Sequence, residues 1–143
     1  MEKQLEATYV DTGKVRLIYK FIIGWGEESL RADEAAASAA EQGYFWPYYF
    51  ALMEQGASPT AEDLPVEKLQ GLAQQLGLDM NKFNASLLSR KHEAKVRQDD
   101  AEGRALGVTG TPTLFINGIK QDGAASLKVL QDIIDPMLQK SGK

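Results

Sequence analysis

The sequence has 143 residues, of which 43% are hydrophobic and 25% charged, with a formal net charge of −4 at pH 7. A chain of this length can bury a core as a single domain without disulfides or a structural metal. The acidic net charge does not favour binding to nucleic acid or to an anionic membrane surface. The densest apolar run, residues 15–23, is far too short to span a bilayer and contains Arg16 and Lys20.

The first element predicted from the residues alone is a strand at residues 15–23. Its apolar positions are Val15, Leu17, Ile18, Tyr19, Phe21, Ile22 and Ile23. This density is more typical of a strand buried on both faces than of an edge strand, in which apolar and polar residues alternate. We therefore expect this strand to be covered on both sides.

The middle of the chain, residues 27–106, is predicted to be a helical insertion. Ser29 is suited to cap a helix over residues 30–42, whose alanine-rich sequence permits close packing against neighbours. Gly43 follows as the expected stop, because glycine readily takes the left-handed conformation that ends a helix. A second helix is expected at residues 45–54.

Three further helices are expected to complete this insertion. A polar connection at residues 59–63 leads to a helix at residues 65–76, for which Pro65 suits the first turn. Asp79 is expected to cap a short helix, and residues 91–106 are expected to form the last one. That last helix is dense in charge, so we expect it to be largely solvated.

The clearest structural signals follow one another in residues 107–123. Gly107 is suited to end the preceding helix, and Pro112 has no amide hydrogen, so it fits a strand only at its first residue or at an edge. The proline drives Thr111, which precedes it, towards extended geometry. A strand is therefore expected to begin at about Thr113.

The strand at residues 113–116 is followed by Asn117 and Gly118, the preferred pair for a two-residue type I′ turn. Residues 119–121 are then expected to return as the second strand of a hairpin. On turn chemistry alone this is a plain surface hairpin with a trans proline, because only about 5% of X-Pro bonds in folded proteins are cis.

A closing helix is expected to begin near Ser126. It has an apolar stripe at helical spacing, formed by Leu127, Leu130, Ile133, Ile134 and Leu138. Pro136 should kink this helix or end it early, because proline removes a backbone hydrogen bond in a helix interior.

Several residues suggest a site, but a structural role explains each of them better. Residues 44–50 are rich in aromatic side chains of the kind found in binding surfaces, yet large aromatics mainly supply buried area, so core packing is favoured. His92, the only histidine, lies between two charged residues and is expected to be solvated. Asp99, Asp100 and Glu102 lack a convergent ligand set, so we predict a solvated face, with no metal site and no cofactor.

The stretch from Gly107 to Gly118 resembles the cis-proline segment of the DsbA-like thiol-disulfide oxidoreductases. Three other segments resemble that family in the same order. They are residues 9–19, similar to the family's second strand with its lead-in; residues 35–46, similar to the opening of its inserted helical domain; and residues 76–79 with Phe83, similar to a later helix junction. Together these segments cover nearly the whole chain.

The resemblance implies a truncated thioredoxin-like fold of the α/β (α+β) class, residues 1–143 forming a single domain. In this arrangement residues 1–24 and 107–143 form the sheet and the C-terminal helix, and residues 27–106 form the inserted helices. The peptide bond between Thr111 and Pro112 is expected to be cis. Family members are mostly exported, but no secretory signal is expected ahead of the fold, so the compartment stays open.

The resemblance also implies that part of the family's fold is absent. In the family a hydrophobic strand comes first, then Cys-x-x-Cys at the start of a long helix, of which residues 1–7 would be the last turns, with Leu5 on the inner face. The absent strand normally lies between the strands at Val15 and Thr113, so each is expected to have an unpaired edge. Either these two strands pair directly as antiparallel neighbours, or two chains exchange an element; we expect a homodimer.

The chain contains no cysteine, so it cannot carry out thiol-disulfide exchange by itself, and no enzymatic activity is assigned to it. The resemblance implies that the peptide-binding half of the family's site survives at Gly110, Thr111 and Pro112. We therefore expect a non-catalytic or chaperone-like module that binds extended or unfolded peptides, or one that dimerises through open sheet edges. The alternative is a truncated or engineered fragment of an oxidoreductase whose activity resides in the full-length protein.

Overall fold

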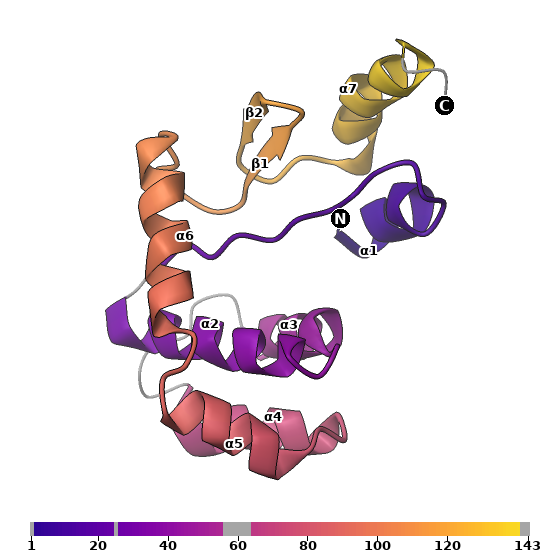
Figure 1. Cartoon of the computed structure of the whole chain (residues 1–143). Coiled ribbons are helices and arrows are strands. Elements are labelled where there is room, and N and C mark those ends of the chain that lie inside the picture. The colour runs from indigo at the N-terminus through magenta and orange to yellow at the C-terminus, as the bar shows by residue number, and fades with distance from the viewer. Residues whose placement is uncertain (1, 25, 56–63, 141–143) are drawn as a thin grey trace. The chain divides into compact units, whose positions relative to one another are not determined.

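The computed structural model describes residues 2–24, 26–55 and 64–140 (Figure 1). The expected connection at residues 59–63 lies outside these ranges. The chain divides into two compact units: unit 1 comprises Met1–Tyr19 and Gly107–Lys143, and unit 2 comprises Lys20–Leu106. The described residues are mainly helical, with one two-stranded sheet, and none of their helices has the length and apolar character needed to cross a membrane.

Unit 1 combines a helical segment at its start with a hairpin and a helix from the other end of the chain. Helix α1 (Glu2–Leu5) continues into the π-helical turn η1 (Glu6–Val10). Strands β1 (Thr113–Ile116) and β2 (Ile119–Asp122) form the hairpin, and α7 (Leu127–Lys140) follows it.

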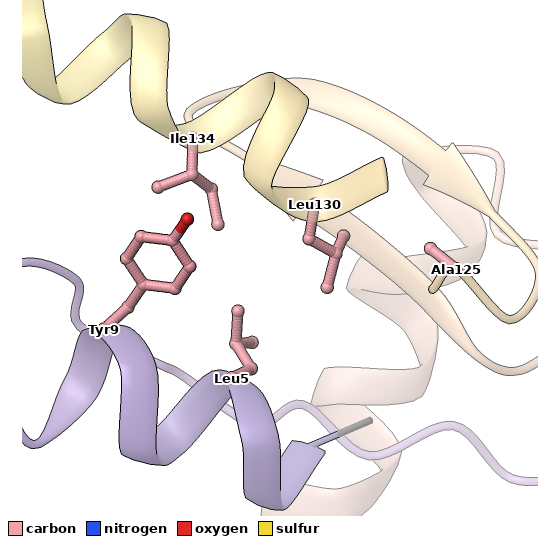
Figure 2. Close-up of a cluster of buried hydrophobic side chains, with 5 residues drawn as sticks. All are labelled: Leu5, Tyr9, Ala125, Leu130 and Ile134. Carbon is pink, nitrogen blue, oxygen red and sulfur yellow. The ribbon is translucent and has the colours of Figure 1, made fainter. Parts of the chain in front are cut away.

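The core of unit 1 lies between η1, the last residue of α1 and α7. Figure 2 shows Leu5 and Tyr9 pointing towards Leu130 and Ile134 of α7. All four side chains are buried, which confirms that Leu5 lies on an inner face. The hydroxyl of Tyr9 donates a hydrogen bond of 2.6 Å to Oδ1 of Asp135, so the aromatic ring fills the core while its polar end reaches the surface.

In residues 9–19, which resemble the family's second strand with its lead-in, the lead-in begins at Tyr9. This residue lies in the π-helical turn, and its carbonyl oxygen accepts hydrogen bonds from the amides of Lys14 and Val15. Gly13, with a φ of +71°, allows the reversal that brings those amides back to the turn. Burial of the Tyr9 ring against α7 therefore prolongs the helical segment, and extended chain begins only at Val15.

The apolar segment at residues 15–23 pairs with no strand among the described residues, and the prediction that both of its faces are buried is wrong for residues 15–19. In residues 15–19 the exposure alternates: Val15 and Leu17 are half-buried, whereas Arg16 and Ile18 are exposed, Ile18 by 59%. Alternation of this kind is the mark of an extended chain with one covered face. Arg16 and Ile18 lie on the second face and are exposed, so apolar composition alone overestimated the burial of this face.

The direct pairing of this segment with residues 113–116 is also wrong. Within the described ranges, β1 pairs only with β2, in antiparallel register from Thr113 opposite Asp122 to Ile116 opposite Ile119. The hairpin itself confirms the sequence analysis. Asn117 and Gly118 both have positive φ, +46° and +89°, as a type I′ turn requires.

Pro136 was predicted either to kink the closing helix or to end it early. The early end is wrong. Helix α7 includes Pro136 and continues to Lys140. The half-buried Leu138 packs against the core cluster one half-turn beyond the proline, and this contact offsets the missing backbone hydrogen bond.

Unit 2 contains five helices in its described residues. They are α2 (Gly26–Ala40), α3 (Phe45–Glu54), α4 (Val66–Gln75), α5 (Met80–Leu88) and α6 (Glu93–Ala105). The helix at residues 45–54 and the Asp79 cap are confirmed, since Asp79 accepts hydrogen bonds from the amides of Asn81 and Lys82. The Ser29 cap is wrong, because α2 begins three residues earlier and the Ser29 hydroxyl instead accepts from the amide of Gly24.

The core of unit 2 rests on close packing against the alanine-rich face of α2. Ala35 and Ala39 are fully buried, and Tyr48 and Phe83 fill the space among the helices with ring centroids 5.7 Å apart. The hydroxyl of Tyr48 donates to the carbonyl of Leu69 at 2.9 Å. The preference for core packing is therefore confirmed for Tyr48, the most buried of the aromatic residues at 44–50.

The prediction that α6 presents a solvated acidic face is wrong for two of the three carboxylates named. Asp99 is 1% exposed and pairs with Lys20 at 3.0 Å, and Lys20 also lies 2.8 Å from Glu102. Asp100 is half-buried and accepts a hydrogen bond of 3.0 Å from the amide of Ile23. The acidic residues of α6 thus hold the extended segment that leads into α2.

The half-buried Asp33 of α2 has one carboxyl oxygen, Oδ2, that is shielded from solvent. Its Oδ2 has no hydrogen-bond partner among the residues that the structure describes. Burial, followed by the negative charges of Asp100 and Glu34, raises the pKa of Asp33 to about 8. This carboxyl group is therefore mainly protonated in the folded protein at neutral pH.

Replacing Asp33 should alter how stability depends on pH. The pKa of Asp33 is raised on folding, from 3.8 to about 8, so its contribution to stability is full below about pH 4 and is lost as the pH rises to about 8. Asp33→Asn should remove this loss and make the protein more stable above pH 8, by on the order of a few kcal/mol. Guanidinium unfolding followed by tryptophan fluorescence at pH 5, 7 and 8.5 measures this.

The matched control is Asp11→Asn, because Asp11 is exposed. Its stability should follow the wild-type pH dependence. Parallel pH profiles for Asp33→Asn and the wild type would contradict the prediction.

Candidate functional site

The candidate site is the loop between Gly107 and β1, which contains the predicted residues Gly110, Thr111 and Pro112. All three are exposed, and the peptide bond between Thr111 and Pro112 is cis. Gly107 has a φ of +76°, which ends the helical geometry of α6 and turns the chain into the loop. The structure therefore brings the three residues together on the surface of unit 1.

Contacts at both ends hold this loop in place. At the start, the ammonium group of Lys120 donates to the carbonyl of Gly107 at 2.7 Å. At the end, the hydroxyl of Thr113 donates to the carbonyl of Gly110 at 2.7 Å, and the amide of Gly123 donates to the carbonyl of Pro112 at 2.9 Å. An exposed loop tied to a hairpin in this way keeps a defined backbone shape.

The pattern of the hairpin determines which backbone groups of β1 point away from β2. In an antiparallel pair closed by a two-residue turn, Ile116 and Ile119 exchange hydrogen bonds, and the bonded positions then alternate along the strand. The bond from the Gly123 amide to Pro112 continues the same alternation. The backbone groups of Thr113 and Phe115 therefore point to the open edge of β1.

The chemistry available at this site is hydrogen bonding and apolar contact. The sequence contains no thiol, and the described residues hold no group of three or more histidine and carboxylate side chains suited to a metal ion. His92 lies in unit 2, where its half-buried Nε2 is hydrogen-bonded to Oε1 of Glu41, so the prediction that it is a solvated residue is wrong. The loop therefore has no thiol with which to exchange disulfides.

The sequence analysis missed the residues that support the loop. Val108 is 6% exposed and anchors the loop in unit 1, while Lys120 and Thr113 bind its carbonyl groups. The preference of threonine for bonding to nearby backbone is a signal that was present in the sequence. A lysine that reaches a carbonyl 13 residues away gives no such signal.

Comparison with known proteins identifies the class of this cysteine-free chain with its exposed proline loop and hairpin. The family model described as Thioredoxin matches residues 1–136, and the chain belongs to that family. Among solved structures, oxidised BdbD from Bacillus subtilis matches with a TM-score of 0.84 at 18% identity, covering 96% of this chain and 76% of that one. This likeness shows that the fold is of the DsbA-like type, as the sequence analysis predicted.

Two groups of curated relatives also match. The chain is 33% identical over 99 residues to the Na(+)/H(+) antiporter NhaA 3 of Salinispora tropica, covering 69% of this chain and 14% of that protein. It is 29% identical over 119 residues to the probable disulfide bond formation protein D of Bacillus anthracis, covering 80% of this chain and 55% of that protein. The chain therefore spans only part of the length of either relative.

Removing the ammonium group of Lys120 should loosen the loop. Lys120→Met keeps most of the aliphatic chain but removes the hydrogen bond to Gly107. We expect a loss of about 0.5–1.5 kcal/mol in the free energy of unfolding and faster amide hydrogen exchange at residues 108–111. Lys140→Met, which changes an exposed lysine of α7, is the control. Exchange rates at residues 108–111 that match those of the control would contradict the role assigned to Lys120.

Proposed function

We propose that this chain binds extended polypeptide at Gly110, Thr111 and Pro112 without carrying out thiol-disulfide exchange. The observation that carries the proposal is the exposed loop, fixed at both ends by Lys120 and Thr113, in a chain that has no cysteine. Its ligands are unfolded or extended peptide segments, whether or not they contain cysteine.

The binding mode follows from backbone chemistry. An extended peptide can satisfy exposed N–H and C=O groups by adding a strand, so the backbone supplies affinity and alternate side chains supply specificity. Thr111 is exposed and lies two residues before β1, so its backbone N–H and C=O groups are the ones that we expect a peptide to pair with. A chaperone-like role is consistent with this mode, since backbone pairing does not depend on one ligand sequence.

A second candidate function is that of a fragment whose enzymatic activity belongs to a longer protein. The observation in its favour is coverage, since this chain spans 55% of the probable disulfide bond formation protein D of Bacillus anthracis. Adding an upstream strand and a Cys-x-x-Cys segment should then yield a protein that reduces insulin disulfides. A reconstructed protein that folds but leaves insulin intact would count against this candidate.

Peptide binding should depend on Thr111. In Thr111→Arg the large charged side chain obstructs an incoming strand, so we expect the affinity for a cysteine-free, permanently unfolded polypeptide to fall about tenfold or more. Fluorescence anisotropy of the labelled polypeptide measures this. Thr109→Arg is the matched control, since Thr109 is also exposed but precedes the loop contact.

Two results would overturn the proposed function. One is an affinity of Thr111→Arg equal to that of Thr109→Arg. The other is a wild-type chain that binds no unfolded polypeptide in the micromolar range. Circular dichroism of both variants establishes that any loss of affinity is not a loss of fold.

A further inference from the structure

The turn of the hairpin places the side-chain amide of Asn117 beside the backbone nitrogen of Gly118. Both residues are exposed. A Cβ atom built on Gly118 would meet no atom within 4 Å other than those of its chain neighbours, so the space around this peptide bond is open. The Gly118 amide donates no hydrogen bond to any residue in the described ranges. No hydrogen bond of its own therefore has to break before its nitrogen reacts.

An asparagine followed by glycine loses ammonia without an enzyme when the two groups meet. The Gly118 nitrogen attacks Cγ of Asn117, the new N–Cγ bond closes a five-membered succinimide ring, and the side-chain nitrogen leaves as ammonia with the proton from Gly118. Water then opens the ring at Cγ to give aspartate, or at the backbone carbonyl carbon to give isoaspartate. Glycine permits the attack because it has no side chain and the fewest backbone restrictions.

The other two asparagines of the chain are held in a helix and lack a following glycine. Asn81 and Asn84 both lie in α5. The amide after Asn81, that of Lys82, donates to Oδ1 of Asp79 at 3.2 Å. The amide after Asn84 lies inside the helix, where backbone hydrogen bonds engage it. Attack at either asparagine therefore requires the helix to open first.

A second carbonyl side chain is followed by glycine at the end of the hairpin, at Asp122 and Gly123. There the glycine amide donates a hydrogen bond of 2.9 Å to the carbonyl of Pro112. The carboxylate of Asp122 pairs with Lys120 at 3.0 Å and has no ammonia to lose. Asn117 is therefore the one residue in the described ranges at which an asparagine, a following glycine and an unbonded glycine amide coincide.

The side chain of Asn117 also links the hairpin turn to α7. Its Nδ2 donates a hydrogen bond of 3.7 Å to Sδ of Met137, in the last turn of that helix. Deamidation replaces the donor by a carboxylate oxygen, and neither oxygen nor sulfur then supplies a proton to the contact. The new negative charge also lies near the C-terminal end of α7, where the helix dipole disfavours anions.

We propose that Asn117 is a site of spontaneous deamidation, with the Gly118 nitrogen as its internal nucleophile, and that the reaction uncouples the hairpin turn from α7. Water is the only co-reactant. Isoaspartate adds one carbon to the main chain inside a two-residue turn whose ends, Ile116 and Ile119, are paired. This inference does not depend on the proposed function.

The first test compares the three asparagines within one sample. The wild-type chain is incubated at pH 8, circular dichroism monitors its fold, and peptide mass spectrometry measures the replacement of –NH₂ by –OH at each asparagine. Conversion at Asn117 should be faster than at Asn81 or Asn84 by about tenfold or more, because the helical sites must open before they react.

A methyltransferase specific for isoaspartate, with labelled S-adenosylmethionine, identifies the product. It should label the aged wild type and leave Asn117→Gly unlabelled, since that variant keeps a Gly-Gly turn without a side chain to react. Equal conversion at the three asparagines, or labelling that persists in Asn117→Gly, would overturn the inference. Conversion at Asn117 in guanidinium but not in the folded chain would overturn it as well, because the turn would then protect the residue.

The second test concerns the contact with α7. Asn117→Asp supplies the deamidated side chain on a normal backbone, and the amides of Ile116 and Ile119 should exchange about threefold to tenfold faster than in the wild type. Asn81→Asp, which makes the same change at an exposed position of α5, is the matched control and should leave these rates unchanged. Equal rates in the two variants would overturn the uncoupling of the turn from α7.

Discussion

The packing of η1 against α7 is the interaction on which unit 1 depends. Tyr9 and its hydrogen-bond partner Asp135 are separated by 126 residues, so this contact closes nearly the whole chain into one loop. Burial of Tyr9 with Leu130 and Ile134 supplies the free energy, about 1.5–3 kcal/mol for each large apolar side chain. The hairpin and the extended segment at residues 15–19 both pack on the surface formed in this way.

That core explains why the hairpin can present an unpaired edge. A two-stranded hairpin is marginal in water by itself, and β1 gains its stability from Leu114 and Ile116, which pack on the core. Among the described residues, β1 pairs only with β2, and the exposed loop at residues 110–112 leads directly into this hairpin in unit 1.

Much of the fold was predictable because local signals agreed with each other. Asn117 and Gly118 specify a turn whatever surrounds them, and Asp79 and residues 45–54 show the cap and the helical pattern that the structure contains. The proline and the family resemblance also indicated the loop at residues 110–112, which is exposed; its role in binding peptide stays a prediction. These features depend on neighbours in sequence, so they can be read without knowledge of the tertiary contacts.

The errors arose where distant contacts decide the outcome. The apolar residues at 15–23 indicated burial on two faces, but at residues 15–19 only the face with Val15 and Leu17 packs on the core, and Ile18 is exposed. The charged α6 indicated solvation, but Lys20 and the amide of Ile23 bind its carboxylates from a segment more than 70 residues earlier. Pro136 indicated a break, but packing of Leu138 keeps the helix intact. Amino-acid composition does not show which distant residues pack against, or form ion pairs with, a given residue.

The central claim is that extended polypeptide binds at Gly110, Thr111 and Pro112. Hydrogen exchange of the wild-type chain, measured amide by amide by NMR with and without a cysteine-free unfolded polypeptide, tests it most directly. The account predicts that the amide of the exposed Thr111 exchanges rapidly without polypeptide and slows by at least tenfold when it is bound, while the amide of Leu114, already bonded to β2, changes little. Protection that appears elsewhere, with the amide of Thr111 unchanged at saturating polypeptide, would contradict it.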